Sequence, residues 1–154
     1  MNLYFDTSAL IKLFHEEKGT VVVTDLIENK ENKIYISELA KIEFYCALYR
    51  RLRNNEISKK DLEKAVNGFE IQIQDFNIDP LGHAVINEAE KLIKRFGCDY
   101  GLRTLDALQL ATFYLISEED WNFVTTDITL YKVVIATGLR AINPLNMERN
   151  SHDE

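Results

Sequence analysis

Cysteine is scarce in this sequence, which contains only Cys46 and Cys98. Neither has a second cysteine or a histidine beside it at the spacing of metal ligands. A disulfide framework or a structural zinc site would require more such residues at defined spacings. We therefore expect both cysteines to be reduced thiols packed within the protein.

Long hydrophobic runs are also missing. No apolar stretch approaches the roughly 18 to 20 residues that are needed to cross a bilayer. The N-terminus has no basic region followed by a sustained apolar segment, which a secretory signal requires. These absences lead us to expect a cytoplasmic protein that does not contact the membrane.

Positive charge is in deficit, since 18 Lys and Arg residues face 25 Asp and Glu residues and the net charge is −7. Binding nucleic acid mainly by electrostatics requires clustered cations that neutralise phosphates. The balance argues against such a surface over the whole protein. It leaves open that part of the surplus acid forms a metal-binding cluster.

The apolar content is sufficient for one core. With 154 residues, of which 46% are hydrophobic, the chain is too short for two ordinary domains. We expect one domain over residues 1–146, followed by a polar tail over 147–154.

Short apolar runs alternate with segments of helical periodicity along the whole domain. The runs predict strands at 3–5, 33–37, 75–78, 122–125 and 139–142. The periodic segments predict helices at 8–14, 20–29, 38–53, 59–73, 80–96, 104–116 and 128–137. Expected helix boundaries include a cap at Thr7 or Ser8, a Ser58–Asp61 capping box, an Asp79 cap before Pro80, and a stop at Gly97. This alternation predicts an α/β fold in which a parallel sheet lies between helices in three α/β/α layers.

Four acidic residues stand where apolar ones would be expected. Asp6 and Asp127 each end a predicted strand, and Asp106 interrupts the first turn of an almost wholly apolar helix. Glu43 shares a helix face with apolar residues three and four positions away, so we expect its face to point inward. In open α/β sheets, ligands bind beyond the carboxyl ends of the strands, where these acids are expected to converge.

Each acid also has an ordinary structural explanation. Asp6 and Asp127 could be turn residues, and Asp106 could be a capping or dipole partner at its helix start. Glu43 could form a buried ion pair with Lys12 or Lys41. As a group, however, four neighbouring carboxylates repel one another by roughly 4 kcal/mol for each close pair at an effective dielectric of 20, so protons or a cation must relieve the repulsion.

Oxygen donors without imidazole or thiolate favour Mg²⁺ or Mn²⁺ over zinc. The hydroxyls of Ser8 and Thr126 stand beside two of the acids and could orient carboxylates or bound water. A haloacid-dehalogenase-like phosphatase is disfavoured, because its second acid would stand at the position of Ser8.

Three stretches in this order resemble the PIN-domain family, and within it the VapC-like toxin ribonucleases. They are LYFDTSALIKLF, LRTLDALQLATF and FVTTD, together with the inward Glu43, Gly138-Leu139 and Asn143-Pro144. The resemblance extends from residue 3 to about residue 144.

The resemblance implies a parallel sheet of four or five strands and a Mg²⁺- or Mn²⁺-dependent cleft that cuts single-stranded or looped RNA. Asp6, Glu43, Asp106 and Asp127 match the family's acidic, metal-binding quartet, and Ser8 and Thr126 match its supporting hydroxyls. Members are often homodimers and are often neutralised by a small antitoxin protein. The resemblance therefore implies an endoribonuclease that is the toxin of a type II toxin–antitoxin pair.

An aromatic and basic strip on the helix that bears Glu43 is a candidate RNA contact. It contains Tyr45, Tyr49, Arg50, Arg51 and Arg53, and Arg103 stands before another helix. The alternative is a solvated helix end at which arginines favour the negative pole of the dipole. The net charge also keeps open a catalytically silent PIN-like binding module.

Overall fold

The computed structural model describes residues 1–147 and contains one five-stranded sheet in the order β3-β2-β1-β4-β5. Every neighbouring pair of strands is parallel. The strands are β1 (Asn2–Phe5), β2 (Lys33–Ser37), β3 (Asn77–Asp79), β4 (Asn122–Val124) and β5 (Arg140–Ile142). The predicted α/β class and parallel sheet are confirmed, with five strands.

The helices follow the strands in alternation. They are α1 (Thr7–Leu10), α2 (Thr20–Glu28), α3 (Glu38–Arg53), α4 (Lys59–Gln72), α5 (His83–Tyr100), α6 (Thr104–Ile116), α7 (Ile128–Ala136) and α8 (Pro144–Met147), with short 3-10 turns η1 (Ile11–Leu13) and η2 (Ile73–Asp75). The expected capping box is present, because the Ser58 and Asp61 side chains each bond the other's backbone. Residues 148–154 of the predicted tail lie outside the described part.

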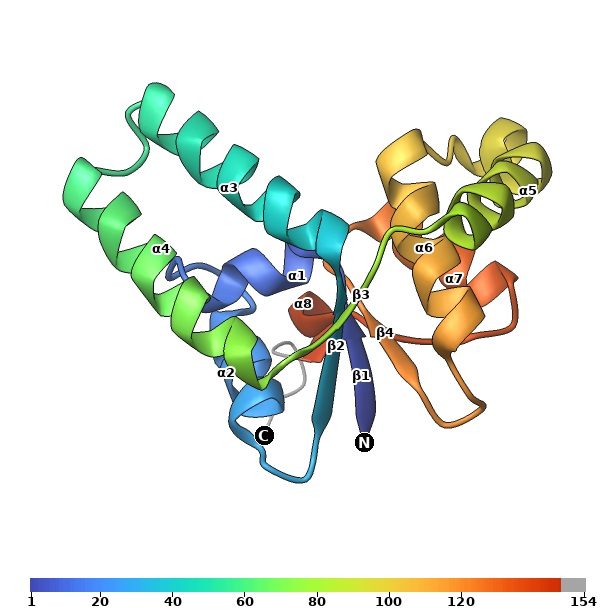
Figure 1. Ribbon diagram of the computed structural model, residues 1–154, viewed down its shortest axis with the longest axis horizontal. Helices are drawn as coiled ribbons and strands as arrows, with labels where there is room; N and C mark the ends of the chain where they lie inside the picture. The colour runs from blue at the N-terminus through green and yellow to red at the C-terminus, as the bar shows by residue number, and fades with distance from the viewer. Residues whose placement is uncertain (148–154) are drawn as a thin grey trace.

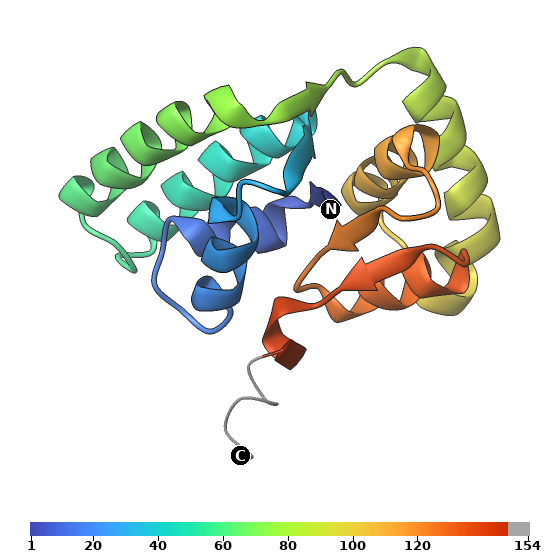
Figure 2. The same ribbon diagram turned by 90° about the horizontal axis from the view of Figure 1, so that it is seen from below.

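Two hydrophobic cores form, one on each face of the sheet. Successive side chains of a strand point to opposite faces, and β1 divides its residues accordingly. Leu3 and Phe5 join the core beneath α1 to α4, whereas Tyr4 joins the core beneath α5, α6 and α7. Figures 1 and 2 show α3 and α4 on one side of the strands and α5 and α6 on the other, which gives three layers.

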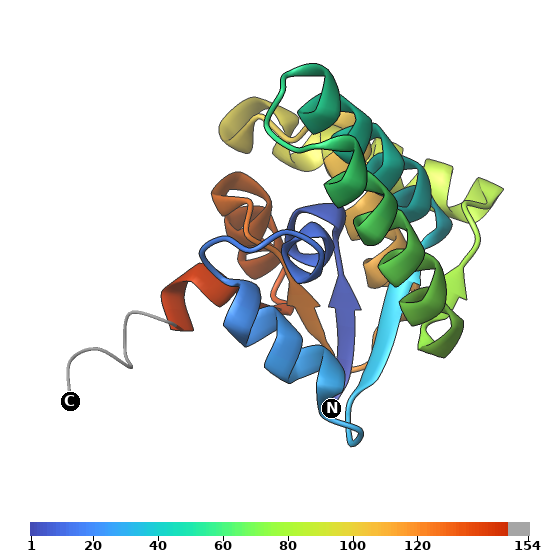
Figure 3. The same cartoon turned by 90° about the vertical axis from the view of Figure 1, so that its left-hand side faces the viewer.

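The strand order reverses at β1, in the centre of the sheet. The chain builds outward from β1 through β2 to β3, then returns to place β4 on the other side of β1. Figure 3 shows the arrowheads of β1, β2 and β4 directed towards the same end of the molecule. Crevices at such reversals are the usual ligand sites of open α/β sheets.

Helix α5 corrects two expectations. It begins at His83 after Gly82, not at Pro80, because Asp79 still pairs with Ser37 in the ladder between β3 and β2. It passes through Gly97 and ends at Gly101, which takes the left-handed backbone conformation at φ 65°. A glycine within a helix is tolerated, whereas the left-handed position is the one that requires it.

Other local expectations also change. Neither Thr7 nor Ser8 caps α1, because Asp6 does so by accepting a hydrogen bond from the Ala9 N–H. Cys46 and Cys98 are free, as expected, but both are exposed and not packed. Among residues 1–147, no helix is both long enough and apolar enough to span a membrane.

The end of α5 can be tested with two glycine variants. We expect Gly101→Ala to destabilise the protein by about 1 kcal/mol, because alanine resists a left-handed backbone. Gly97→Ala is the matched control and should be neutral or stabilising by up to about 1 kcal/mol, because alanine favours helix interiors. Urea denaturation measures both, and a larger loss at Gly97 would contradict this helix boundary.

Candidate active site

A cleft of about 910 Å³ opens where β1 and β4 end. Its walls come from α1, η1, the loop after η1, α3, the start of α6 and the β4–α7 loop. The side chains of Asp6, Glu43, Asp106 and Asp127 all line it. The four acids are thus brought together from segments that lie far apart in the sequence.

Asp6 is the most buried of the four, with 4% of its surface exposed. Its Oδ1 accepts hydrogen bonds from the Ala9 N–H at 3.0 Å and the Ser8 hydroxyl at 2.8 Å. Its Oδ2 accepts one from the Thr125 hydroxyl at 2.7 Å. Burial raises the pKa of Asp6 to about 7, although these three donors oppose the rise, and the charge of Asp127 adds to it.

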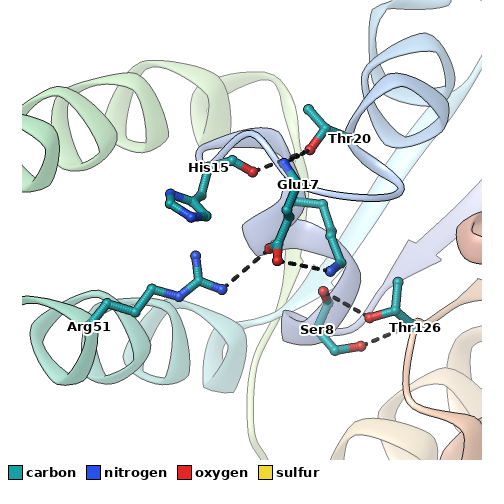
Figure 4. Close-up of polar contacts among 7 residues, drawn as sticks. Ser8, His15, Glu17, Thr20, Arg51 and Thr126 are labelled. Atoms are coloured by element: carbon teal, nitrogen blue, oxygen red, sulfur yellow. Dashed lines mark hydrogen bonds and ion pairs between the residues drawn. The ribbon is translucent and has the colours of Figure 1, made fainter. Parts of the chain in front are cut away.

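Two threonines after β4 have different roles. Thr125 donates to Asp6 and also accepts the Asp127 N–H at 3.1 Å, so it connects two of the acids. Thr126 lines the cleft, but its hydroxyl donates to the Ser8 carbonyl and its N–H donates to the Ser8 hydroxyl, as Figure 4 shows in part. Thr126 therefore connects this loop to α1 and, within residues 1–147, bonds no carboxylate, whereas Ser8 bonds that of Asp6.

Glu43 accepts hydrogen bonds from two neutral side chains. Its Oε1 receives the Thr7 hydroxyl at 3.0 Å and the Gln109 amide nitrogen at 2.7 Å. Burial raises the pKa of Glu43, and these two donors oppose the rise. The alternative of an ion pair with Lys12 is wrong, because Lys12 pairs with Glu17 at 3.3 Å.

The Glu43 face of α3 lines the cleft and is packed in the core only in part, because Leu39 is buried and Ala47 packs against the core. Ile42 is 64% exposed and Cys46 is exposed, whereas Phe44 and Leu48 are buried beneath the helix. The expectation that this face points inward therefore holds for Leu39 but not for Ile42 and Cys46. Apolar residues three and four apart from an acid identify a shared face, but not whether protein or solvent covers it.

Asp106 and Asp127 each lie at a helix start. Asp127 caps α7 by accepting the Leu130 N–H at 2.8 Å. Burial and then the charge of Asp127 raise the pKa of Asp106, while Arg103 at 3.4 Å lowers it. The two aspartates therefore act on each other electrostatically across the cleft.

The candidate ligands suit a hard divalent cation, because all four are carboxylates that offer oxygen atoms. Burial raises the pKa of Asp6 more than its three hydrogen-bond donors lower it, so a cation beside this carboxylate would favour its ionised form. Within the described chain, no three His, Cys, Asp or Glu side chains already form a metal-binding group. The chemistry of the residues thus fits Mg²⁺ or Mn²⁺, while the carboxylates surround the cleft without forming a preassembled cage.

Most candidate RNA contacts lie on the cleft wall. The cleft is lined by Tyr49, Arg50, Arg51, Arg53 and Arg103. Tyr45 is not among the lining residues, because its hydroxyl donates to Glu70 at 3.3 Å and its ring packs against α4.

Three supporting residues were missed by sequence reasoning. Thr7 and Gln109 bond Glu43, and Thr125 bonds Asp6. Gln109 offered a signal, since an amide three positions after Asp106 interrupts the same apolar helix. Thr7 and Thr125 stand next to residues that were chosen, and local sequence does not distinguish their contacts.

The protein is thus an open α/β protein with an acidic cleft where its strand order reverses. Residues 3–135 match the family model of the PIN domain. This match covers most of the chain, so the chain belongs to the PIN-domain family. None of the curated proteins matches it.

Solved structures share this fold over nearly their whole length. VapBC2 from Rickettsia felis, bound to a fragment of promoter DNA, has a TM-score of 0.64 at 18% identity, covering 93% of this chain and 98% of that one. VapC20 from Mycobacterium tuberculosis, a sarcin-ricin-loop-cleaving toxin, has a TM-score of 0.67 at 16% identity, covering 89% of this chain and 95% of that one. A toxin–antitoxin complex from Klebsiella pneumoniae has a TM-score of 0.62 at 18% identity, covering 92% of this chain and 97% of that one. The fold is therefore VapC-like.

The raised pKa of Asp6 predicts a stability change in metal-free protein. The folded pKa is about 7 and the ordinary value is about 3.9, so the folded state holds this proton more tightly than the unfolded state. This group therefore lowers the free energy of unfolding as pH rises from about 4 to 7. We expect Asp6→Asn to be more stable than wild type at pH 8, by roughly 2 kcal/mol, and little different at pH 4.

Urea denaturation in EDTA at both pH values measures this effect. Asp25→Asn, at an exposed position on α2, controls for removal of one negative charge. If Asp6→Asn were less stable than wild type at pH 8, the unfavourable burial of the ionised carboxylate would be contradicted.

Proposed function

We propose that this protein is a metal-dependent endoribonuclease, the toxin of a type II toxin–antitoxin pair. The observation that carries the proposal is the set of four carboxylates that line one cleft, three with pKa values raised by burial. Membership of the PIN-domain family supports a nuclease. The VapC-like fold supports a ribonuclease toxin.

Each acid has a proposed role. Asp6 and Asp106 would bind Mg²⁺ or Mn²⁺ directly, and Asp127 would bind through water. Glu43 would orient the attacking water, with its own position set by Thr7 and Gln109. The bound cation would supply an activated water and would stabilise charge on the phosphate. Ser8 and Thr125 would hold the Asp6 carboxylate in place.

RNA would lie in the cleft between Tyr49, Arg50 and Arg53 on α3 and Arg103 at the start of α6. These cations provide local attraction although the chain has a net charge of −7. A small antitoxin is the proposed protein partner, supported by the complexes among the structural neighbours. We also propose a homodimer, which the family resemblance implies.

The second candidate function is a catalytically silent PIN-like binding module. The surplus of acidic residues favours it, because a strongly acidic protein binds RNA weakly. The two functions differ in whether RNA is cut when Mn²⁺ is present.

Cleavage of RNA with carboxylate variants is the direct test. We expect wild-type protein with Mn²⁺ to cut structured RNA, and Asp6→Asn or Asp106→Asn to reduce the rate at least about a hundredfold, because each would remove a metal ligand. Gel analysis of labelled RNA measures the rate. Asp120→Asn, an exposed aspartate before β4, is the matched control. Equal cleavage by wild type and Asp6→Asn would identify a contaminating nuclease.

Metal binding can be measured without activity. We expect Mn²⁺ to raise the melting temperature of wild type and of Asp120→Asn, because a ligand of the folded state stabilises it. The rise should shrink or vanish in Asp106→Asn, and EDTA should abolish it. Metal binding with no cleavage of any RNA would favour the silent module, whereas no shift in wild type would argue against the metal site.

A further inference from the structure

Three charged side chains form a separate cluster on the cleft wall. The Glu17 carboxylate bridges two cations, with Oε2 at 3.3 Å from the Lys12 ammonium and Oε1 at 3.3 Å from the Arg51 guanidinium. Lys12 comes from η1, Arg51 from α3, and Glu17 from the loop that follows η1. All three line the cleft, and Figure 4 shows Glu17 reaching towards Arg51.

These two cations are better shielded than the other basic residues of the cleft. The side chains of Lys12 and Arg51 are 14% and 16% exposed, whereas the Arg103 side chain is 78% exposed. Arg50 is also exposed. Charges that are shielded from water and salt attract an anion more strongly than exposed ones.

The cluster has unused capacity to bind an anion. Two cations and one carboxylate leave one positive charge in excess. The other terminal nitrogen of Arg51, Nη1, is buried and has no hydrogen-bond partner in the described part of the chain. Buried guanidinium donors normally find an acceptor, so Arg51 keeps a donor that Glu17 does not satisfy.

The present contacts with Glu17 are long. Strong charge-assisted hydrogen bonds between nitrogen and oxygen measure about 2.7 to 2.9 Å, and both contacts here are 3.3 Å. A carboxylate and a phosphodiester each present two oxygens that share negative charge, and Arg recognises both groups. A backbone phosphate could therefore replace the Glu17 carboxylate on the same two cations.

The loop allows this exchange without unfolding. The Thr20 hydroxyl accepts the Glu17 N–H at 3.0 Å and donates to the His15 carbonyl at 3.2 Å, contacts that Figure 4 draws. The Thr20 N–H also donates to the Glu17 carbonyl. Because the Glu17 backbone is held in this way, rotation of its side chain alone would release both cations.

We propose that Lys12 and Arg51 form a binding site for a backbone phosphate of RNA, and that Glu17 occupies this site in the free protein as an internal competitor. Arg51 lies eight residues after Glu43 on α3, about 12 Å along the helix axis. The site therefore holds a phosphate other than the one that is cut. This inference rests on the proposed function, because it assumes that RNA enters the cleft.

Direct binding to RNA tests the site without requiring catalysis. Fluorescence anisotropy with labelled single-stranded RNA of mixed sequence is measured in EDTA, so that cleavage does not interfere. We expect Glu17→Gln to bind about fivefold more tightly than wild type, because the competitor is lost. Glu16→Gln, an exposed neighbour with the same change in charge, should stay within about twofold of wild type.

Loss of a cation should have the opposite effect. We expect Lys12→Gln and Arg51→Gln to bind about five- to tenfold more weakly, and Lys18→Gln, exposed on the same loop, to change little. In an Arg51→Gln background, Glu17→Gln should give little or no gain, because the two residues act on one site. Melting curves verify that each variant is folded, and Lys12→Gln carries the test if Arg51→Gln is not.

Salt dependence distinguishes competition from a structural role. In Glu17→Gln the slope of log affinity against log salt should steepen by about 0.7, the value for one more phosphate contact on a single strand. If Glu17→Gln and Glu16→Gln bind alike, or the gain persists in Arg51→Gln, the competitor role is wrong while RNA binding stands. If wild type and every variant neither bind nor cut RNA, the proposed function fails and the inference fails with it.

Discussion

The carboxylate of Asp6 lies at the end of the central strand, almost completely removed from water. Keeping a negative charge there is unfavourable unless donors or a cation compensate for the lost hydration. The protein supplies donors from both directions along the chain, namely Ser8 and the Ala9 N–H from α1 and Thr125 from the end of β4. The meeting of β1, α1 and β4 at one residue thus determines where the cleft forms.

The same central strand separates the two halves of the protein. Leu3 and Phe5 hold one core and Tyr4 holds the other, so the cleft walls on α3 and α6 belong to differently packed layers. Polar contacts between the walls are few and specific. Gln109 on α6 donates to Glu43 on α3, and Thr126 joins its loop to Ser8 on α1. These bonds connect the two walls close to the acids.

Sequence reasoning predicted the elements well where the signal is local. Apolar runs and helical periodicity identified all five strands, and the Ser58–Asp61 pair identified a helix start. The limits of α5 were missed, because strand pairing extended β3 to Asp79 and only backbone geometry distinguishes Gly97 from Gly101. The acids stood out because carboxylates are unusual at strand ends and on apolar faces. Ser8 was anticipated as a partner from its place beside Asp6. Thr125 was not, since it is 119 residues from Asp6 and no local pattern encodes that contact.

Gln109 has a fixed orientation with an effect beyond its own helix. The buried Tyr4 hydroxyl donates to its oxygen at 2.6 Å, so its amino group must face Glu43. A flipped amide would set its carbonyl oxygen against the Glu43 carboxylate and would remove the acceptor that Tyr4 now uses. Tyr4, in the central strand, therefore favours the orientation in which the amino group of Gln109 faces the cleft. A hydroxyl in the hydrophobic core thus orients a side chain of the polar site, so that Gln109 presents a hydrogen-bond donor to Glu43.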